Sequence, residues 1–242
     1  MSKGEEAVKV LGVWYSPFVM RVRISLNIKS VKYNFLEENL GDKSQLLLQS
    51  NPVHKKVPVL IHEDKPVCES LIIVEHVDQV WSSAPSILPS HPHDRAIARF
   101  WAAYIDHKWY PAFKGIAGAK GEKEIKVLMR EVDEGLALLE DAYNNISKGK
   151  PFFGGDRIGY LDIAFGCFLG WIRVTETVTG AELISEAKTP GLAKWSKKFW
   201  EDDAVRPVMP ETRGVQFVPL KDRDYIIEFR YRWFHYCMEI RR

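Results

Sequence analysis

A serine and a proline, Ser16 and Pro17, stand between an expected strand and an expected helix. A hydroxyl at a helix N-terminus faces unpaired N–H groups and the positive end of the helix dipole, and both would stabilise a thiolate. A small thiol has a pKa near ~8.5, and lowering it by ~2 units takes ~2.7 kcal/mol. A hydroxyl donor together with the dipole can supply that free energy. The alternative is that Ser16 and Pro17 only cap a helix.

A second proline, Pro58, follows Val57 at the start of an expected strand. Proline cannot donate to a sheet ladder, so it belongs at a strand start or a sheet edge. Alternatively, a cis Val57–Pro58 bond would turn the backbone N–H and C=O of Val57 outward. An extended peptide could then pair with them like an added strand.

Glu69 and Ser70 stand at the start of another expected helix, where both residue types suit a cap. They could instead hold an amino-acid head group, with Ser70 and the helix N–H groups on its carboxylate and Glu69 on its ammonium. Lys43, Lys55 and Lys56 are either solvated surface lysines or a clamp for a second carboxylate. Glutathione has two carboxylates, one ammonium, an extended backbone and a thiol, so it would satisfy all these features together.

The elements that must position these residues alternate in type over the first third of the chain. β-branched runs predict strands, and apolar residues at helical spacing predict helices. The predicted order is β-α-β-α-β-β-α, a small α/β sheet unit. The strands are expected at residues 8–14, 33–36, 57–62 and 65–68, and the helices at 17–29, 43–50 and 70–81.

A linker rich in serine and proline, residues 82–92, separates this unit from a nearly all-helical remainder. The sequence therefore predicts domains at 1–81 and 93–242 around that linker. Helices are expected at about 93–118, 121–148, 160–179 and 190–202. The tail at about 213–242 interleaves aromatic residues with arginines, which is typical either of nucleic-acid binding or of a terminal helix packed on the bundle.

The composition is that of a globular protein, with 46% hydrophobic and 27% charged residues. A net charge of +2 argues for neither a nucleic-acid partner nor a membrane partner, and it favours the packed-helix interpretation of the tail. The spacing of the three cysteines matches neither a metal site nor a disulfide framework. We therefore expect no metal, and we expect the protein to reside in a reducing compartment. With no signal-peptide pattern and no long apolar run, we expect a cytoplasmic protein.

The chain closely resembles plant tau-class glutathione transferases over about residues 8–212. The matching stretches are Ser16-Pro17-Phe18, residues 51–60 (NPVHKKVPVL), residues 65–70 (KPVCES), Gly159-Tyr160-Leu161-Asp162 and residues 204–211 (AVRPVMPE). The resemblance implies a thioredoxin-like N-terminal domain, an all-helical C-terminal domain and a homodimer. By position it implies that Ser16 is the catalytic thiol activator. It also implies a glutathione-binding set of Lys43, Lys56, Val57, Glu69 and Ser70.

In that family the electrophile binds between the domains, among apolar and aromatic side chains. For Trp109 and Trp171, the helix core is an equal alternative. The tail after Thr212 differs from the usual family ending, so the role of Phe217 as a lid stays open. The candidates are Phe18, Leu40, Trp109, Tyr110, Trp171 and Phe217.

The expected function is conjugation of glutathione to hydrophobic electrophiles, with glutathione as co-substrate and no prosthetic group. Reduction of organic hydroperoxides is an expected side activity. A thiol transferase or dehydroascorbate reductase would need a low-pKa cysteine where Ser16 stands, and neither position 16 nor 19 is cysteine. A non-catalytic carrier of hydrophobic ligands that binds glutathione is the remaining alternative.

Overall fold

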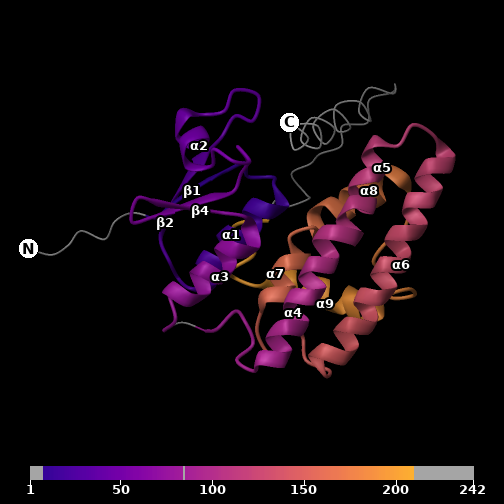
Figure 1. The fold of residues 1–242 in the computed structure, drawn as a ribbon. Helices are drawn as coiled ribbons and strands as arrows, with labels where there is room; N and C mark the ends of the chain where they lie inside the picture. The colour runs from indigo at the N-terminus through magenta and orange to yellow at the C-terminus, as the bar shows by residue number, and fades with distance from the viewer. Residues whose placement is uncertain (1–7, 84, 210–242) are drawn as a thin grey trace, which may run out of the picture.

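A computed structural model describes residues 8–83 and 85–209. A four-stranded sheet in the order β2-β1-β3-β4 forms the first unit, and helices form the rest (Figure 1). The expected tail and Phe217 lie outside the described residues. The sheet unit contains β1 (Val8–Gly12), α1 (Pro17–Ile28), β2 (Tyr33–Glu37), α2 (Gln45–Ser50), β3 (Val59–His62), β4 (Lys65–Cys68) and α3 (Ser70–Val80).

Strand alternation divides the sheet into two covered faces. Val10 and Leu60 point to the face under α1 and α3, whereas Leu11 and Val59 pack with Leu47 of α2 on the other face. β1 runs parallel to β2 and antiparallel to β3, and β3 is antiparallel to β4. The predicted β-α-β-α-β-β-α order is therefore confirmed, and its helices lie on both sides of the sheet.

β3 is shorter than the predicted strand at 57–62. The ladder begins at Val59, which pairs with Leu11 on one side and Cys68 on the other. The Val57–Pro58 bond is cis. Pro58 has no N–H to give to a ladder, which explains why the regular strand starts after it.

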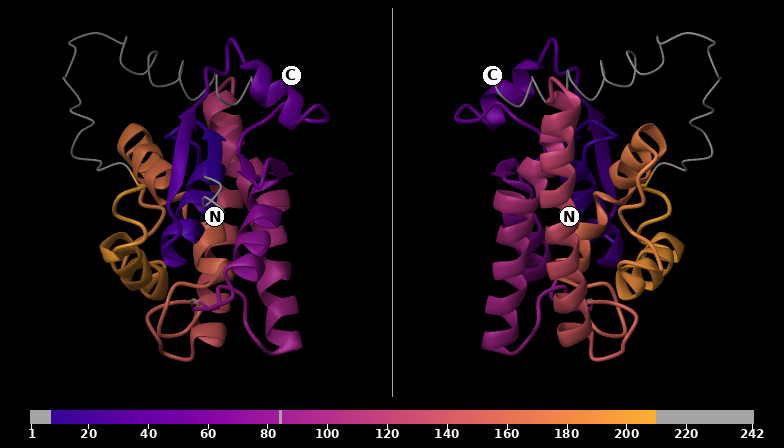
Figure 2. Two further views of the ribbon diagram at one scale, coloured as in Figure 1. Left: turned by 90° about the vertical axis from the view of Figure 1, so that its left-hand side faces the viewer. Right: turned by 90° about the vertical axis from the view of Figure 1, so that its right-hand side faces the viewer.

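The helical unit is built from one long helix, α6, and several shorter helices around it. In the two side views α8 and α9 lie on one flank and α4 on the other (Figure 2). Its elements are α4 (Pro92–Tyr104), a π-helical turn η1 (Ile105–Trp109), α5 (Tyr110–Gly118), α6 (Glu122–Ser147), α7 (Tyr160–Gly166), α8 (Leu169–Thr179) and α9 (Pro190–Glu201).

Two of the predicted helices are interrupted. The one expected at 93–118 contains the η1 turn, and the one expected at 160–179 breaks between α7 and α8. Every residue from Tyr160 to Leu169 is buried. Packing on all sides therefore determines the conformation of this segment, which has no solvent-exposed face of the kind a surface helix shows. Gly166 lies against the ring of Phe199, where a Cβ would collide, so helices α7 and α9 can approach only at a glycine.

A buried ion pair holds the connection between the two units. Asp78 of α3 accepts hydrogen bonds from the backbone N–H groups of Ile87 and Leu88, at 2.8 and 3.0 Å. The ammonium of Lys29 lies 2.7 Å from Asp78 and also donates to the Pro85 carbonyl at 2.8 Å. Burial alone would raise the pKa of Asp78, but these donors outweigh it and hold that pKa below its ordinary value.

Asp78→Asn should therefore lower the free energy of unfolding by about 2–3 kcal/mol at neutral pH, because it leaves the Lys29 charge buried. The folded state binds fewer protons at Asp78 than the unfolded state does. The stabilisation is thus present above the unfolded pKa of about 3.9 and is lost as pH falls below it. Urea unfolding of both proteins from pH 7 to 3 should show the difference shrinking with acid. A difference independent of pH would contradict this account.

Candidate active site

Ser16 caps helix α1 directly after the loop that follows β1. Its backbone is extended, and its Oγ accepts a hydrogen bond from the N–H of Val19 at 3.4 Å. A hydroxyl carries both lone pairs that accept and a proton that donates, so it suits the start of a helix. Ser16 is fully buried, and Pro17 begins the helix. The residue thus combines an O–H donor with a helix N-terminus away from water.

The approach of α1 to the sheet fixes the position of that hydroxyl. A Cβ on Gly12 would lie 2.6 Å from Val19, so only glycine lets the first turn of α1 pack this closely on the end of β1. Ser16 also donates its backbone N–H to the Val13 carbonyl at 3.1 Å. The strand end and the helix start therefore hold the serine from both sides.

The loop that carries Lys56 and Val57 is organised by Asn51. The Asn51 side chain accepts from the N–H of His54 and donates to the Lys56 carbonyl, both at 3.0 Å. Val57 lies just before the β3 ladder, and among the described residues its N–H and C=O have no hydrogen-bond partner. A backbone donor and acceptor are thus presented beside the sheet, with Lys56 half-buried next to them.

Glu69 has a backbone conformation that L-residues rarely adopt, with φ 70° and ψ 118°. Such strain is typical of functional sites. Its side chain is 58% exposed and lies 3.9 Å from His54 Nε2, while Ser70 is buried and starts α3. A carboxylate in the open and a hydroxyl at a helix N-terminus therefore stand next to each other.

Arg21, which was not among the predicted site residues, contacts Ser70 at the start of α3. Its guanidinium is fully buried, donates to Ser70 Oγ at 3.2 Å and pairs with Asp106 at 2.6 and 2.9 Å. It also donates to the Ala164 carbonyl at 2.7 Å. Burial alone would lower the pKa of Arg21, but Asp106 more than offsets this, so the guanidinium stays charged. One cation thereby ties the α3 N-terminus to η1 and α7.

Aromatic side chains lie where the two units meet, next to Ser16. Phe18 is 5.3 Å from Tyr110 and 5.9 Å from Phe168, ring centre to ring centre, and Tyr110 stacks on Phe168 at 5.0 Å. Trp171 donates its indole N–H to the Tyr15 carbonyl at 3.1 Å. Phe18, Tyr110 and Trp171 thus gather around the serine loop, and Phe168 joins them without having been predicted.

Trp109 does not line the aromatic surface beside Ser16. It is 1% exposed, stacks on Phe113 and meets the edge of Phe165, so it lies in the helical core. The pocket role considered for Trp109 is therefore corrected to the core alternative. Leu40 is half-buried in the loop between β2 and α2, and Lys43 is half-buried just before α2.

The surroundings of both cysteines among the described residues disfavour the thiolate. Burial and the neighbouring Glu69 raise the pKa of Cys68, and burial raises the pKa of Cys167 to about 12. A thiol–disulfide enzyme needs the opposite shift. Within residues 8–83 and 85–209, no group of three His, Cys, Asp or Glu side chains could hold a metal ion. No helix in this part of the chain is long and apolar enough to cross a membrane.

Both units of the chain are similar to known protein domains. Residues 6–79 match the family model for the N-terminal domain of glutathione S-transferases, and residues 100–203 match the model for the C-terminal domain. Glutathione S-transferase U17 of Arabidopsis thaliana is 63% identical over 206 residues, which cover 85% of this chain and 91% of the relative.

Two solved structures are similar over almost their whole length. The tau-class glutathione S-transferase of mango, Mangifera indica, is 61% identical with a TM-score of 0.86, covering 95% of this chain and all of the other. Rice GST1, solved in complex with glutathione, is 34% identical with a TM-score of 0.82, covering 94% and 99%.

Proposed function

Because this chain belongs to the plant tau-class glutathione S-transferases and is a glutathione transferase, we propose that Ser16 activates the glutathione thiol. The observation that carries the proposal is the position of the buried Ser16 hydroxyl at the α1 N-terminus, where its Oγ accepts from Val19. The helix dipole and this O–H would both favour the ionised sulfur.

Glutathione would lie extended along the edge formed by Val57 and Pro58. Its cysteinyl backbone would pair with the N–H and C=O of Val57, since neither has a partner among the described residues. Lys43 and Lys56 would receive the glycyl carboxylate. The γ-glutamyl carboxylate would bind Ser70 and the α3 N-terminus, with its ammonium on the exposed Glu69.

The thiolate would then attack an electrophilic carbon held against Phe18, Tyr110 and Trp171. The carbon–sulfur bond forms as the leaving group departs, or as the electron pair moves into an activated double bond. Positioning and thiolate stabilisation would supply the rate. With an organic hydroperoxide, the same thiolate would attack the terminal oxygen and release an alcohol, and a second glutathione would give the disulfide and water.

Replacing Glu69 by alanine should raise KM for glutathione about 10- to 100-fold, because a charged group of the ligand loses its partner. Steady-state kinetics with a chloronitrobenzene substrate would measure this. Glu63→Ala is the matched control, since Glu63 is an exposed acid in the β3–β4 turn. An unchanged KM in Glu69→Ala would remove Glu69 from the proposed set.

We further propose a homodimer formed through α3 and α4. Ile72 on α3 and Phe100 on α4 are 59% and 60% exposed, which is high for large hydrophobic side chains. The two helices are joined beside them by Arg99, whose Nε donates to Glu75 at 2.8 Å. Together these residues suggest one continuous apolar surface.

Phe100→Glu should convert the dimer into a monomer, because it would bury unpaired charges in the interface. Sedimentation equilibrium at micromolar protein would report the mass. Val178→Glu introduces the same charge at another exposed hydrophobic position, on α8, and should leave the mass unchanged. Equal masses for wild type and Phe100→Glu would count against this interface.

A further inference from the structure

One buried cation, Arg21, joins the proposed glutathione site to the helical unit. It lies on α1, the helix that Ser16 caps, and its side chain has no exposed surface. α1 contacts both α3 and α7 where the two units meet (Figure 1). A guanidinium wholly removed from water is costly unless other groups match its charge and its N–H donors. The partners of Arg21 therefore indicate what the buried charge does.

The terminal nitrogens of Arg21 are fixed by partners from three separate elements. Nη1 donates to Asp106 Oδ2 at 2.9 Å and to Ser70 Oγ at 3.2 Å. Nη2 donates to Asp106 Oδ1 at 2.6 Å and to the Ala164 carbonyl at 2.7 Å. Two parallel hydrogen bonds to one carboxylate set the plane of a guanidinium. The contact between Arg21 and Ser70 therefore has a defined direction.

Two aromatic rings restrain the same guanidinium. The guanidinium carbon of Arg21 lies 5.1 Å from the ring centre of Phe18 and 5.3 Å from that of Phe168, within the range of a cation–π contact. Phe18 and Phe168 also meet each other, with ring centres 5.9 Å apart. Phe168 and Asp106 both belong to the helical unit. Residues outside the sheet unit thus set the position of the group that contacts Ser70.

The bond between Arg21 and Ser70 has only one possible donor. A guanidinium has no acceptor, so Ser70 Oγ accepts in this contact and its own proton takes no part in it. Ser70 is 8% exposed and is the first residue of α3, where the γ-glutamyl carboxylate is proposed to lie. A hydroxyl that accepts from a cation is a stronger donor to an anion, because successive hydrogen bonds polarise one another.

We propose that Arg21 is a positioning residue for the γ-glutamyl carboxylate of glutathione and acts through the hydroxyl of Ser70. Arg21 is fully buried, so it touches no ligand itself. It fixes the orientation of the Ser70 hydroxyl and strengthens the hydrogen bond that this hydroxyl donates. The inference rests on the placement of the carboxylate proposed above. It extends glutathione recognition to α1 and, through Asp106, to the π-helical turn η1.

The test compares two thiol substrates that differ only in this carboxylate. One is glutathione, and the other is 4-aminobutanoyl-cysteinylglycine, which keeps the ammonium, the thiol and the glycyl carboxylate. Conjugation to a chloronitrobenzene substrate by the full-length protein gives kcat/KM for each thiol. Arg21→Lys keeps the charge but lacks the planar fork that reaches Ser70 and Asp106 together. We expect it to lower kcat/KM about tenfold for glutathione and less than about twofold for the analogue.

A purely structural role of Arg21 would lower kcat/KM for both thiols by the same factor, and that result would overturn the proposal. A second variant covers the case in which Arg21→Lys does not fold. Arg21→Met combined with Asp106→Asn removes both charges, so no unpaired charge is left buried. It should show the same selective loss for glutathione.

Ser70→Ala tests the placement of the carboxylate by itself. It should also lower kcat/KM about tenfold for glutathione and much less for the analogue. Equal effects on both thiols in Ser70→Ala would overturn that placement and this inference together. A selective loss in Ser70→Ala, with equal effects on both thiols in the Arg21 variants, would overturn the inference alone.

Arg23 provides a matched control on the same helix. Its Nε donates to the Tyr33 hydroxyl at 3.2 Å, and its guanidinium carbon lies 4.6 Å from the ring centre of Phe35. Arg23 thus resembles Arg21 in having a polar partner and an aromatic one, but neither belongs to the proposed glutathione site. Arg23→Lys should leave kcat/KM unchanged for both thiols.

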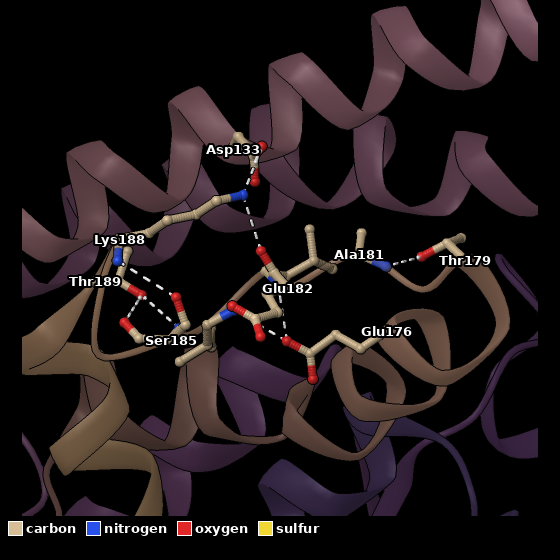
Figure 3. A network of polar contacts seen from close by, with 10 residues as sticks. Asp133, Glu176, Thr179, Ala181, Glu182, Ser185, Lys188 and Thr189 are labelled. Carbon is tan, nitrogen blue, oxygen red and sulfur yellow. Dashed lines mark hydrogen bonds and ion pairs between the residues drawn. The ribbon is translucent and has the colours of Figure 1, made fainter.

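Glu176 provides a control for structural damage. It accepts from the backbone N–H groups of Leu183 and Ile184 at 2.9 and 3.0 Å, in a network that ties α8 to the loop at residues 180–189 (Figure 3). That loop contains no proposed site residue. Glu176→Ala should therefore change kcat/KM for both thiols by the same factor. A loss confined to glutathione in either control would show that the selectivity does not depend on Ser70 and would overturn the proposal.

Discussion

Ser16→Ala is expected to lower kcat/KM for glutathione conjugation by about 10²- to 10³-fold, the cost typical of removing one preorganised donor to a developing or stabilised anion. Ionisation alone explains much of this. At pH 6.5 a bound thiol with a pKa of about 6.5 is half thiolate, whereas one with a pKa of about 8.5 is about 1% thiolate. Glutathione affinity should change little, because the carboxylates and the ammonium keep their proposed partners.

The defect of Ser16→Ala should shrink at alkaline pH, where glutathione ionises without help. Rates from pH 6 to 9 for both proteins measure this trend. The matched control is Ser44→Ala, because Ser44 caps α2 in the same way, accepting from Leu47 N–H at 3.1 Å. Each loses a cap worth about 1 kcal/mol, but only Ser16→Ala should lose the chemistry. Equal activity losses in the two variants would reduce Ser16 to a structural cap.

Asp162→Ala is expected to lower the free energy of unfolding by about 3–5 kcal/mol, because it leaves several buried donors without an acceptor. Asp162 is fully buried and accepts from the N–H groups of Phe153, Gly154 and Gly159 at 2.8–2.9 Å. The indole of Trp195 donates to it at 2.7 Å. One carboxylate thus joins the loop before α7, the α7 N-terminus and α9.

Urea unfolding at pH 7.5 would measure this loss. Burial raises the pKa of Asp162 to about 6, so the group is ionised at that pH and accepts from all its donors. Asp156→Ala is the control, since Asp156 is exposed and pairs with the exposed Lys150, at 2.6 Å. That change should stay within about 0.5 kcal/mol. A loss below about 1 kcal/mol in Asp162→Ala would contradict the central role of this carboxylate.

The sheet unit was predictable because its signals are local. Ser16 and Pro17 follow the residue preferences of a helix start, and β-branched runs mark the strands. Asp162 falls in the first turn of the helix predicted at 160–179, and it accepts from the Gly159 N–H. Its bonds to Phe153 and Trp195 could not be foreseen, because they join elements that only the tertiary fold brings together.

Arg21 shows the limit of local reasoning most clearly. A charged residue among Val19, Met20 and Val22 was the available signal that something buried must pair with it. Its partner Asp106 is 85 residues away in the π-helical turn η1. Spacing alone predicted an unbroken helix there, and a π-turn changes which side chains face inward.

The same turn decides between two neighbouring aromatic residues. Trp109 ends η1 and faces the helical core, whereas Tyr110 begins α5 and meets Phe18. From a regular helical period either residue could line the site. Only the packed structure assigns one to the core and the other to the serine loop.

The pKa of the bound glutathione thiol tests the account most directly. It can be followed by the ultraviolet absorbance of the thiolate during a pH titration of the glutathione complex, for wild type and for Ser16→Ala. We predict a pKa about 2 units below that of a free thiol in wild type, and a return toward about 8.5 in Ser16→Ala. An equally low pKa in both proteins would show that the thiolate is stabilised without the Ser16 hydroxyl and would contradict the mechanism.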